Sequence, residues 1–214
     1  MTKSEIIRTL QEQAMVAVVR GDNLEQGKKI ASACIAGKVR AIEVAYTNSY
    51  ASECIRELQT EYYNRNDVCI GAGTVLDAPT AKRAIEVGAK YIVSPSFNKE
   101  TALLCNRYGI PYIPGCMTIR EIVEAMEMGS EMIKLFPGSV LGTSYIKAVK
   151  APLPQVSIMV TGGVNVDNMQ DWFAAGANAI GIGGEFNTLG MEGKFDQITS
   201  LAMKYYEAYQ KGRK

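Results

Sequence analysis

The stretch MGSEMIKLFPG (residues 128–138) combines a helix end, a glycine and an apolar run in one short segment. Gly129 stands where a helix would stop, at a position that tolerates a left-handed backbone. The apolar run after it is typical of a strand buried on both faces. This segment predicts a unit made of a helix, a glycine stop, a buried strand and a polar loop to the next helix.

The same unit recurs along the chain. The clearest copies are AGKVRAIEVAY (36–46), VGAKYIVSPSF (87–97) and AGANAIGIGGE (175–185), with a looser copy in RYGIPYIPG (107–115). In these copies the place of Gly129 is taken by Gly37, Gly88, Gly176 and Gly109. Strands are expected at 15–19, 39–44, 68–72, 90–94, 111–114, 131–136, 156–160 and 179–182. Helices are expected at 3–13, 23–36, 49–63, 78–87, 99–108, 118–128, 142–150, 166–175 and about 195–210.

Strict alternation of strands and helices favours a parallel sheet covered by helices. Eight repeats fit a closed (β/α)8 barrel better than an open doubly wound sheet. The chain has 214 residues, and no Pro/Gly/Ser-rich linker or charge block divides it. We therefore predict a single domain, residues 1–214, that forms a (β/α)8 TIM barrel with an extra N-terminal helix.

Composition narrows the classes of function. Lys and Arg number 23 and Asp and Glu 22, a net charge of +1, which gives no electrostatic footprint for nucleic acid or anionic lipid. No segment approaches the roughly 20 apolar residues of a membrane span, and the N-terminus lacks an apolar signal core. The five cysteines form no CxxC and fit packed free thiols in a reducing compartment. We expect a cytoplasmic protein that binds neither nucleic acid nor a membrane.

The absence of histidine removes Ser-His-Asp and Cys-His catalysis and His-ligated zinc. Two charged residues nevertheless interrupt apolar strands, Lys134 in EMIKLFP and Glu43 in RAIEVAY. Because strand side chains alternate, both should point into the barrel while their neighbours pack under the helices. A lysine that loses hydration favours its neutral amine, a nucleophile toward ketones, and a carboxylate beside it can move protons. A structural ion pair, or a lysine that reaches out to solvent, is the alternative.

Further candidates follow other predicted strands, at the barrel end where active sites form. The loops Thr161-Gly162-Gly163 and Gly181-Ile182-Gly183-Gly184 either bind phosphate or make simple tight turns. The loop Gly71-Ala72-Gly73-Thr74 can bring a hydroxyl into the pocket. Arg20 either clamps a carboxylate or phosphate or is a solvated arginine. The aromatic side chains Tyr205, Tyr206 and Tyr209 indicate a packing or subunit face.

The motifs IEVAYTN, IGAGTVL, YIVSPSF, IPG, IKLFPGS and TGGV resemble, in order and spacing, the 2-keto-3-deoxy-6-phosphogluconate / 2-keto-4-hydroxyglutarate aldolases. The resemblance spans about Val16 to Gly184. It implies a class I aldolase on a (β/α)8 barrel that needs no metal or cofactor and is usually a homotrimer. Its substrates would be small 2-keto acids, cleaved to pyruvate and either glyceraldehyde 3-phosphate or glyoxylate.

The same resemblance implies roles for individual residues. Lys134 would be the Schiff-base lysine and Glu43 the proton shuttle. Thr74 would hold the pyruvyl carboxylate. The pocket walls would be Pro95 and Phe136, and the site for the distal end of the substrate would be Gly162, Gly163, Gly183 and Gly184.

Two positions depart from the family pattern. Many members read E-V-T-L-R, but Thr47 stands here in place of the arginine, for which Asn48 or Arg20 could compensate. Many members read GGSW, but here Glu185 replaces the serine, and a carboxylate repels phosphate unless it turns away or a lysine screens it. The unphosphorylated 4-hydroxy-2-oxoglutarate therefore remains an alternative substrate. Two other functions also stay open: a phosphate-binding isomerase or decarboxylase with Lys134 as a fixed charge, and a non-catalytic keto-acid-binding barrel.

Overall fold

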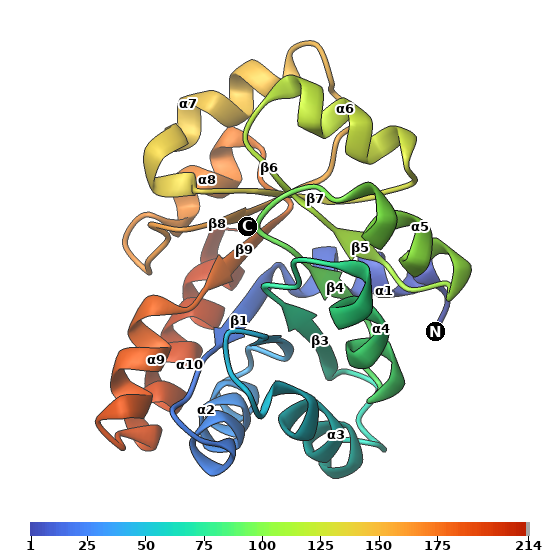
Figure 1. Cartoon of the computed structure of the whole chain (residues 1–214). Coiled ribbons are helices and arrows are strands. Elements are labelled where there is room, and N and C mark those ends of the chain that lie inside the picture. The colour runs from blue at the N-terminus through green and yellow to red at the C-terminus, as the bar shows by residue number, and fades with distance from the viewer. Residues whose placement is uncertain (213–214) are drawn as a thin grey trace.

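The computed structural model describes residues 1–212 and shows a parallel sheet curled into a barrel and wrapped by helices (Figure 1). The strands are β1 Met15–Val19, β2 Ala41–Ala45, β3 Cys69–Gly73, β4 Ile92–Val93, β5 Tyr112–Ile113, β6 Gly115–Cys116, β7 Ile133–Leu135, β8 Ile158–Thr161 and β9 Ala179–Ile182. The helices are α1 Lys3–Gln13, α2 Leu24–Ala36, α3 Ala51–Glu61, α4 Ala78–Glu86, α5 Lys99–Arg107, α6 Ile119–Glu127, α7 Gly138–Lys150, α8 Met169–Ala175, α9 Gly184–Met191 and α10 Phe195–Gly212.

The strand order confirms the predicted barrel. Neighbouring strands pair in parallel in the order β5-β4-β3-β2-β1-β9-β8-β7-β6. The two ends of this order, β5 and β6, are halves of one extended segment that is interrupted at Pro114, which has no N–H to donate. The nine short strands therefore occupy the eight strand positions of a nearly closed (β/α)8 barrel.

Several predicted elements need correction. The helix α9 was not predicted, because Gly183 and Gly184 resemble a loop; Gly181 and Ile182 belong to β9, and Gly184 begins α9. The helix α7 begins at Gly138 rather than at 142, although Gly142 (φ 72°, ψ 169°) interrupts it. A shorter α8 starts at Met169, not at 166.

Four of the predicted glycine stops have positive φ, namely Gly88, Gly109, Gly129 and Gly176. Gly37 does not: its φ is −81°, and Lys38 (φ 75°) takes the left-handed position. Gly37 is instead a contact point, because a Cβ there would lie 2.4 Å from the carbonyl oxygen of Thr199 on α10. The glycine therefore permits the close packing of α2 against α10.

Two apolar clusters surround the strands. Residues such as Ile133 and Leu135 pack between the sheet and the helices. The other cluster fills the barrel interior, where Met132 meets Ile6 and Leu10 of α1. Helix α1 thus closes the end of the barrel at which the strands begin. A polar group inside the barrel is therefore accessible only from the opposite end.

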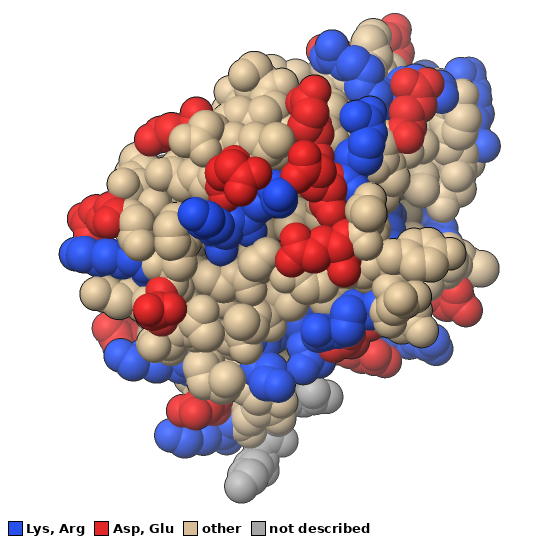
Figure 2. Space-filling model, turned by 90° about the horizontal axis from the view of Figure 1, so that it is seen from below, with Lys and Arg blue, Asp and Glu red and all other residues tan. Residues whose placement is uncertain are grey.

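The face in Figure 2 carries acidic and basic side chains interspersed, without a broad area of one sign. Among the described helices, none is long and apolar enough to cross a membrane.

Candidate active site

Lys134 of β7 and Glu43 of β2 face each other across the barrel interior, where strand alternation placed them. The distance from Lys134 Nζ to Glu43 Oε1 is 3.5 Å. The Lys134 side chain is 7% exposed and the Glu43 side chain 0%. A charged pair this deep is costly unless it is retained for chemistry or for specificity of folding. The pair is the most strongly desolvated ion pair in the described chain.

Two glycines of β3 make room for the carboxylate. A Cβ on Gly73 would lie 2.0 Å from Glu43 Oε1, and a Cβ on Gly71 would lie 2.5 Å from the ring of Tyr91. The Tyr91 hydroxyl donates to the carbonyl oxygen of Ile42 at 2.7 Å and so fixes the peptide just before Glu43. Gly71 and Gly73 therefore leave the space inside the barrel that Tyr91 and Glu43 occupy. Thr74 follows Gly73 at the rim of the barrel.

The two oxygens of Glu43 differ. Oε1 accepts the hydrogen bond of Lys134, whereas the buried Oε2 has no hydrogen-bond partner within residues 1–212. An unpartnered buried acceptor is costly, and it is free to take a proton. On the other side of the amine, Nζ lies 5.4 Å from the centre of the Phe136 ring. The amine therefore contacts one carboxylate oxygen and lies over one aromatic ring, and its side chain is largely shielded from solvent.

A cavity of about 420 Å³ opens above Lys134 at the carboxyl ends of the strands. Every candidate site residue lines it except Glu43, which is fully buried behind its contact with Lys134. These lining residues are Arg20, Thr74, Pro95, Lys134, Phe136, Thr161, Gly162, Gly163, Gly183 and Gly184. The other lining residues are Val18, Val164, Asn165, Gly181 and Glu185. Sequence reasoning missed Val18, Val164 and Asn165, whereas Gly181 stood in a candidate glycine loop and Glu185 was noted as a departure from the family pattern.

Two threonines line this cavity. Thr74 has a φ of 54°, a strained conformation for a residue with a β-branched side chain, and such strain concentrates at functional sites. Thr161 Oγ1 is buried and lacks a hydrogen-bond partner in the part of the chain that the structure describes. Gly181 beside it leaves the space, since a Cβ there would lie 2.3 Å from Oγ1. Thr161 therefore contributes a buried, unsatisfied hydroxyl beside the cavity, which a ligand reaches only if the side chain turns.

Arg20 reaches the cavity from the end of β1, and its backbone is held by Asn187 of α9. Asn187 Oδ1 accepts from the Arg20 N–H at 2.6 Å, and Nδ2 donates to the carbonyl oxygens of Val18 at 2.8 Å and Gly183 at 2.6 Å. Sequence reasoning missed Asn187, because nothing around it marks a site. Thr47, which replaces the family's arginine, does not line the cavity within the described residues. Of the two residues that could compensate for it, Arg20 lines the cavity and Asn48 does not.

The four glycines expected at the distal end of a substrate, Gly162, Gly163, Gly183 and Gly184, all line the cavity. Asn168 Nδ2 donates to the carbonyl oxygen of Gly163 at 2.8 Å, which fixes this loop. Glu185 follows in the first turn of α9, and its Oε2 accepts a hydrogen bond of 2.8 Å from the hydroxyl of Tyr205. The carboxylate is thus held by a tyrosine rather than screened by a lysine.

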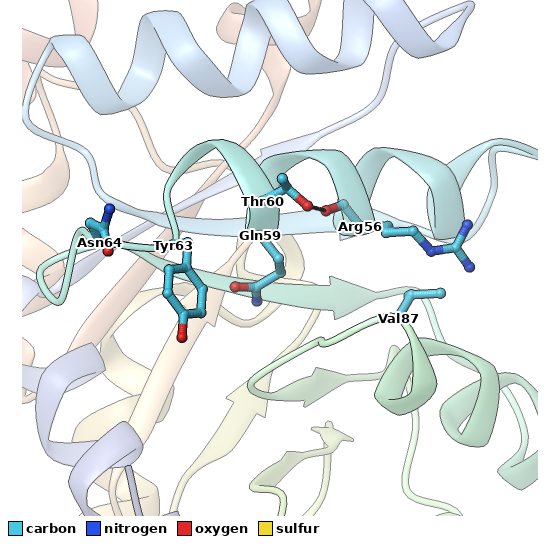
Figure 3. Close-up of a pocket in the computed structure, with 6 residues that line it drawn as sticks. All are labelled: Arg56, Gln59, Thr60, Tyr63, Asn64 and Val87. Carbon is cyan, nitrogen blue, oxygen red and sulfur yellow. Dashed lines mark hydrogen bonds between the residues drawn. The ribbon is translucent and has the colours of Figure 1, made fainter.

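A second hollow of about 480 Å³ lies on the outside of the barrel, at the ends of α3 and α4 (Figure 3). Gln59 donates its amide to the carbonyl oxygens of Ile70 and Gly88, and the Thr60 hydroxyl donates to that of Arg56. Its described lining holds no carboxylate beside Arg56. Its ionisable lining residues are Arg56 and Tyr63, so this hollow holds no lysine–carboxylate pair like Lys134–Glu43.

The five cysteines are buried and unpaired, as predicted for packed thiols. Burial raises the pKa of four of them, Cys54, Cys69, Cys105 and Cys116, to about 12. Residues 1–212 contain no group of three or more Cys, Asp or Glu side chains placed to hold a metal ion.

Comparisons of the sequence with known proteins all point to the same family. A sequence model of the KDPG and KHG aldolases matches residues 6–201. The chain is 32% identical to the 2-dehydro-3-deoxy-phosphogluconate aldolase of Treponema pallidum, over 93% of this chain and 95% of the relative. It is 31% identical to the KHG/KDPG aldolase of Escherichia coli, over 96% of each chain.

Solved structures agree with the sequence comparisons. A native KDPGal structure superposes with a TM-score of 0.85 at 28% identity, over 93% of this chain and 95% of that one. The KDPG aldolase of Legionella pneumophila, solved with pyruvate captured at low pH as a covalent carbinolamine intermediate, gives a TM-score of 0.83 at 26% identity. That match covers 91% of this chain and 95% of the Legionella chain.

Proposed function

The chain belongs to the KDPG and KHG aldolase family, and we propose that it cleaves 2-keto-4-hydroxy acids through a Schiff base on Lys134. The observation that carries the proposal is the buried Lys134–Glu43 pair at the base of a cavity that opens only at the carboxyl ends of the strands. The Legionella relative forms a covalent carbinolamine with pyruvate. A carbinolamine is the adduct that precedes an imine.

The proposed reaction begins with attack of the Lys134 amine on the C2 ketone, followed by loss of water to give an iminium ion. The iminium is an electron sink, so the C3–C4 bond breaks once a base takes the C4 hydroxyl proton. Glu43, directly or through a water, is that base, and the aldehyde leaves. Glu43 then returns the proton to C3 of the enamine, and water releases pyruvate from Lys134.

The cavity suggests how the substrate lies. Thr74 would bind the pyruvyl carboxylate near Lys134, and Pro95 and Phe136 would flank the reacting carbons. The Thr161 hydroxyl, which has no hydrogen-bond partner among residues 1–212, would bind a substrate oxygen once its side chain turns toward the cavity. Arg20 and the distal end would take the far end of the substrate, a phosphate in 2-keto-3-deoxy-6-phosphogluconate or a carboxylate in 4-hydroxy-2-oxoglutarate.

Borohydride trapping tests the proposal. Reduction in the presence of pyruvate should leave a stable added mass on the peptide that contains Lys134, and Lys134→Ala should abolish both the adduct and cleavage. Lys147→Ala, on the exposed face of α7, is the matched control and should keep both. Glu43→Gln should lose most turnover while forming some imine.

The absence of an adduct at Lys134 in an active enzyme would indicate a lysine that acts only as a fixed charge, as in an isomerase or decarboxylase. The absence of pyruvate release from every keto acid offered would indicate a non-catalytic binding barrel. We further propose that the enzyme needs no cofactor, is cytoplasmic and assembles as a homotrimer. Sedimentation of the purified chain tests the assembly.

A further inference from the structure

An acidic side chain stands at the end of the cavity that we propose binds the anionic end of the substrate. Glu185 is in the first turn of α9, next to Gly183 and Gly184, and it lines the cavity. The first N–H groups of a helix have no partner inside the helix, and a carboxylate in the first turn can bind them. A carboxylate free to do so would compete with the phosphate or carboxylate of a substrate and would also repel it.

The hydroxyl of Tyr205 restrains this carboxylate. Tyr205 belongs to α10, is fully buried, and packs edge-on against Phe186 with ring centres 5.8 Å apart. Its hydroxyl donates to Glu185 Oε2 at 2.8 Å. Burial raises the pKa of Tyr205, and the hydrogen bond and negative charge of Glu185 raise it further, so the hydroxyl remains a donor at any working pH.

The restraint comes from α10, which packs against α9. Helices α9 and α10 lie side by side (Figure 1), and Glu185 also lines an outer groove between them with Leu189 and Leu201. Glu185 therefore stands between two spaces, the cavity and this outer groove. The hydrogen bond from the buried hydroxyl holds the carboxylate at α10, and we expect this to leave the start of α9 open to a ligand.

We infer that Tyr205 is a positioning residue for the distal end of the cavity. By holding the Glu185 carboxylate against α10, it sets how tightly an anionic substrate end binds at the start of α9. Tyr205 touches no substrate and acts only through Glu185. This inference rests on the proposed function for the direction in which the substrate lies, and it makes selectivity between phosphorylated and unphosphorylated keto acids a property of the Tyr205–Glu185 pair.

The test measures the affinity of the full chain for inorganic phosphate by calorimetry. Tyr205→Phe should weaken binding about fivefold or more, because the released carboxylate approaches the anion. Glu185→Gln should bind phosphate at least as tightly as the wild type. The double variant should match Glu185→Gln, since no carboxylate is left to release. Tyr206→Phe and Glu192→Gln, the latter at the other end of α9, are the matched controls.

Catalysis gives a second measure of the same effect. For Tyr205→Phe, KM for the phosphorylated substrate should rise more than KM for the unphosphorylated one. Glu185→Asp provides a variant that spares the buried tyrosine: its shorter side chain keeps the charge but cannot keep the hydrogen bond. It should weaken phosphate binding as Tyr205→Phe does, and it decides the question if Tyr205→Phe does not fold.

Three results would overturn the inference: wild-type phosphate affinity in both Tyr205→Phe and Glu185→Asp, a double variant as weak as Tyr205→Phe, or no phosphate binding to either the wild type or Glu185→Gln. Borohydride trapping of pyruvate on the same samples is read separately. A missing adduct contradicts the proposed function, whereas a normal adduct without the phosphate effect contradicts only the role of Tyr205.

Discussion

Gly73 is the residue at which the backbone most directly controls the proposed catalytic pair, Lys134 and Glu43. We expect Gly73→Ala to lower kcat about a hundredfold, because its Cβ would lie 2.0 Å from Glu43 Oε1 and push the carboxylate from Lys134. Some stability should also be lost, because the Cγ of the fully buried Glu43 would lie only 2.3 Å from that Cβ. Turnover and thermal unfolding measured on the same preparation separate these effects.

Gly71 and Gly27 are the controls for this prediction. Gly71→Ala meets the buried ring of Tyr91, which cannot move, and should cost about 1–3 kcal/mol of unfolding free energy. Gly27→Ala makes contacts of 3.4 and 3.5 Å and should leave turnover intact. Full activity in Gly73→Ala would contradict the position of Glu43 described here.

The cysteines should be inert in the folded protein. Burial holds the pKa of Cys69 and Cys116 at about 12, so almost no thiolate is present at pH 8, and reagents cannot reach the sulfur. Iodoacetamide should therefore label none of the five thiols of native protein at pH 8. All five should be labelled in guanidinium chloride. Rapid labelling without denaturant, detected by mass, would count against this packing.

Sequence patterns could predict side-chain direction but not contacts between distant helices. Alternation within IKL and IEV was sufficient to place Lys134 and Glu43 inside the barrel, because period-two geometry is local. The bond between Tyr205 and Glu185 joins α10 to α9, and the aromatic spacing around Tyr205 indicated only packing. Such bonds depend on how helices pack in three dimensions, which no local pattern encodes.

At the scale of elements, α9 is tied to β1 by Asn187. Asn187→Leu keeps the volume but leaves the Arg20 N–H and the carbonyl oxygens of Val18 and Gly183 without this partner. We expect a loss of about 1–3 kcal/mol in unfolding free energy and a higher KM, because Arg20 is no longer held at the rim. Denaturant titration and steady-state kinetics measure the two effects.

Gln210→Leu is the control, because it also removes a side-chain amide but at the exposed end of α10. It should change neither the unfolding free energy nor KM. An unchanged KM in Asn187→Leu would show that Arg20 does not depend on this bond.

The strands and most helices were predictable as elements, whereas α9 was not. Gly183, Gly184 and Gly190 lower its helix propensity, and the segment looks like a loop. Tertiary contacts stabilise it instead: Phe186 is fully buried, and a Cβ on Gly190 would lie 2.3 Å from Ile30 of α2. Glycine is thus required there for close packing, and close packing is invisible in a single-sequence pattern.

At the scale of the whole molecule, the two ends of the barrel differ in structure: one holds the cavity and the other is closed. The cavity occupies the carboxyl end of the strands, while α1 and an ion-pair cluster close the other end. In this cluster Asp67 pairs with Arg65 at 2.7 Å and with Arg40 at 2.9 Å, and its carbonyl oxygen accepts from Gln13 of α1 at 2.8 Å. The cluster therefore joins the starts of β2 and β3 to the α1 plug.

This division predicts an acid-sensitive stability that is separate from activity. The hydrogen bonds of Arg65, and then the charge of Arg40, lower the pKa of Asp67 from 3.8 to about 2, although burial opposes them. A carboxyl whose pKa is lower in the folded state stabilises the protein above its unfolded pKa. Its contribution is therefore complete above about pH 4 and is lost as the pH falls toward 2.

Asp67→Asn should remove that contribution. Because the side chain is 40% exposed, solvent screening limits the loss at neutral pH to about 1 kcal/mol or less. Between pH 4 and 2 the variant should lose less further stability than the wild type, and kcat at neutral pH should be unchanged. Urea unfolding between pH 4 and 2 measures the unfolding free energy of both proteins. Glu124→Gln, in the exposed Arg120–Glu124 pair on α6, is the control. An equal pH slope in wild type and Asp67→Asn would show that this cluster does not stabilise the closed end.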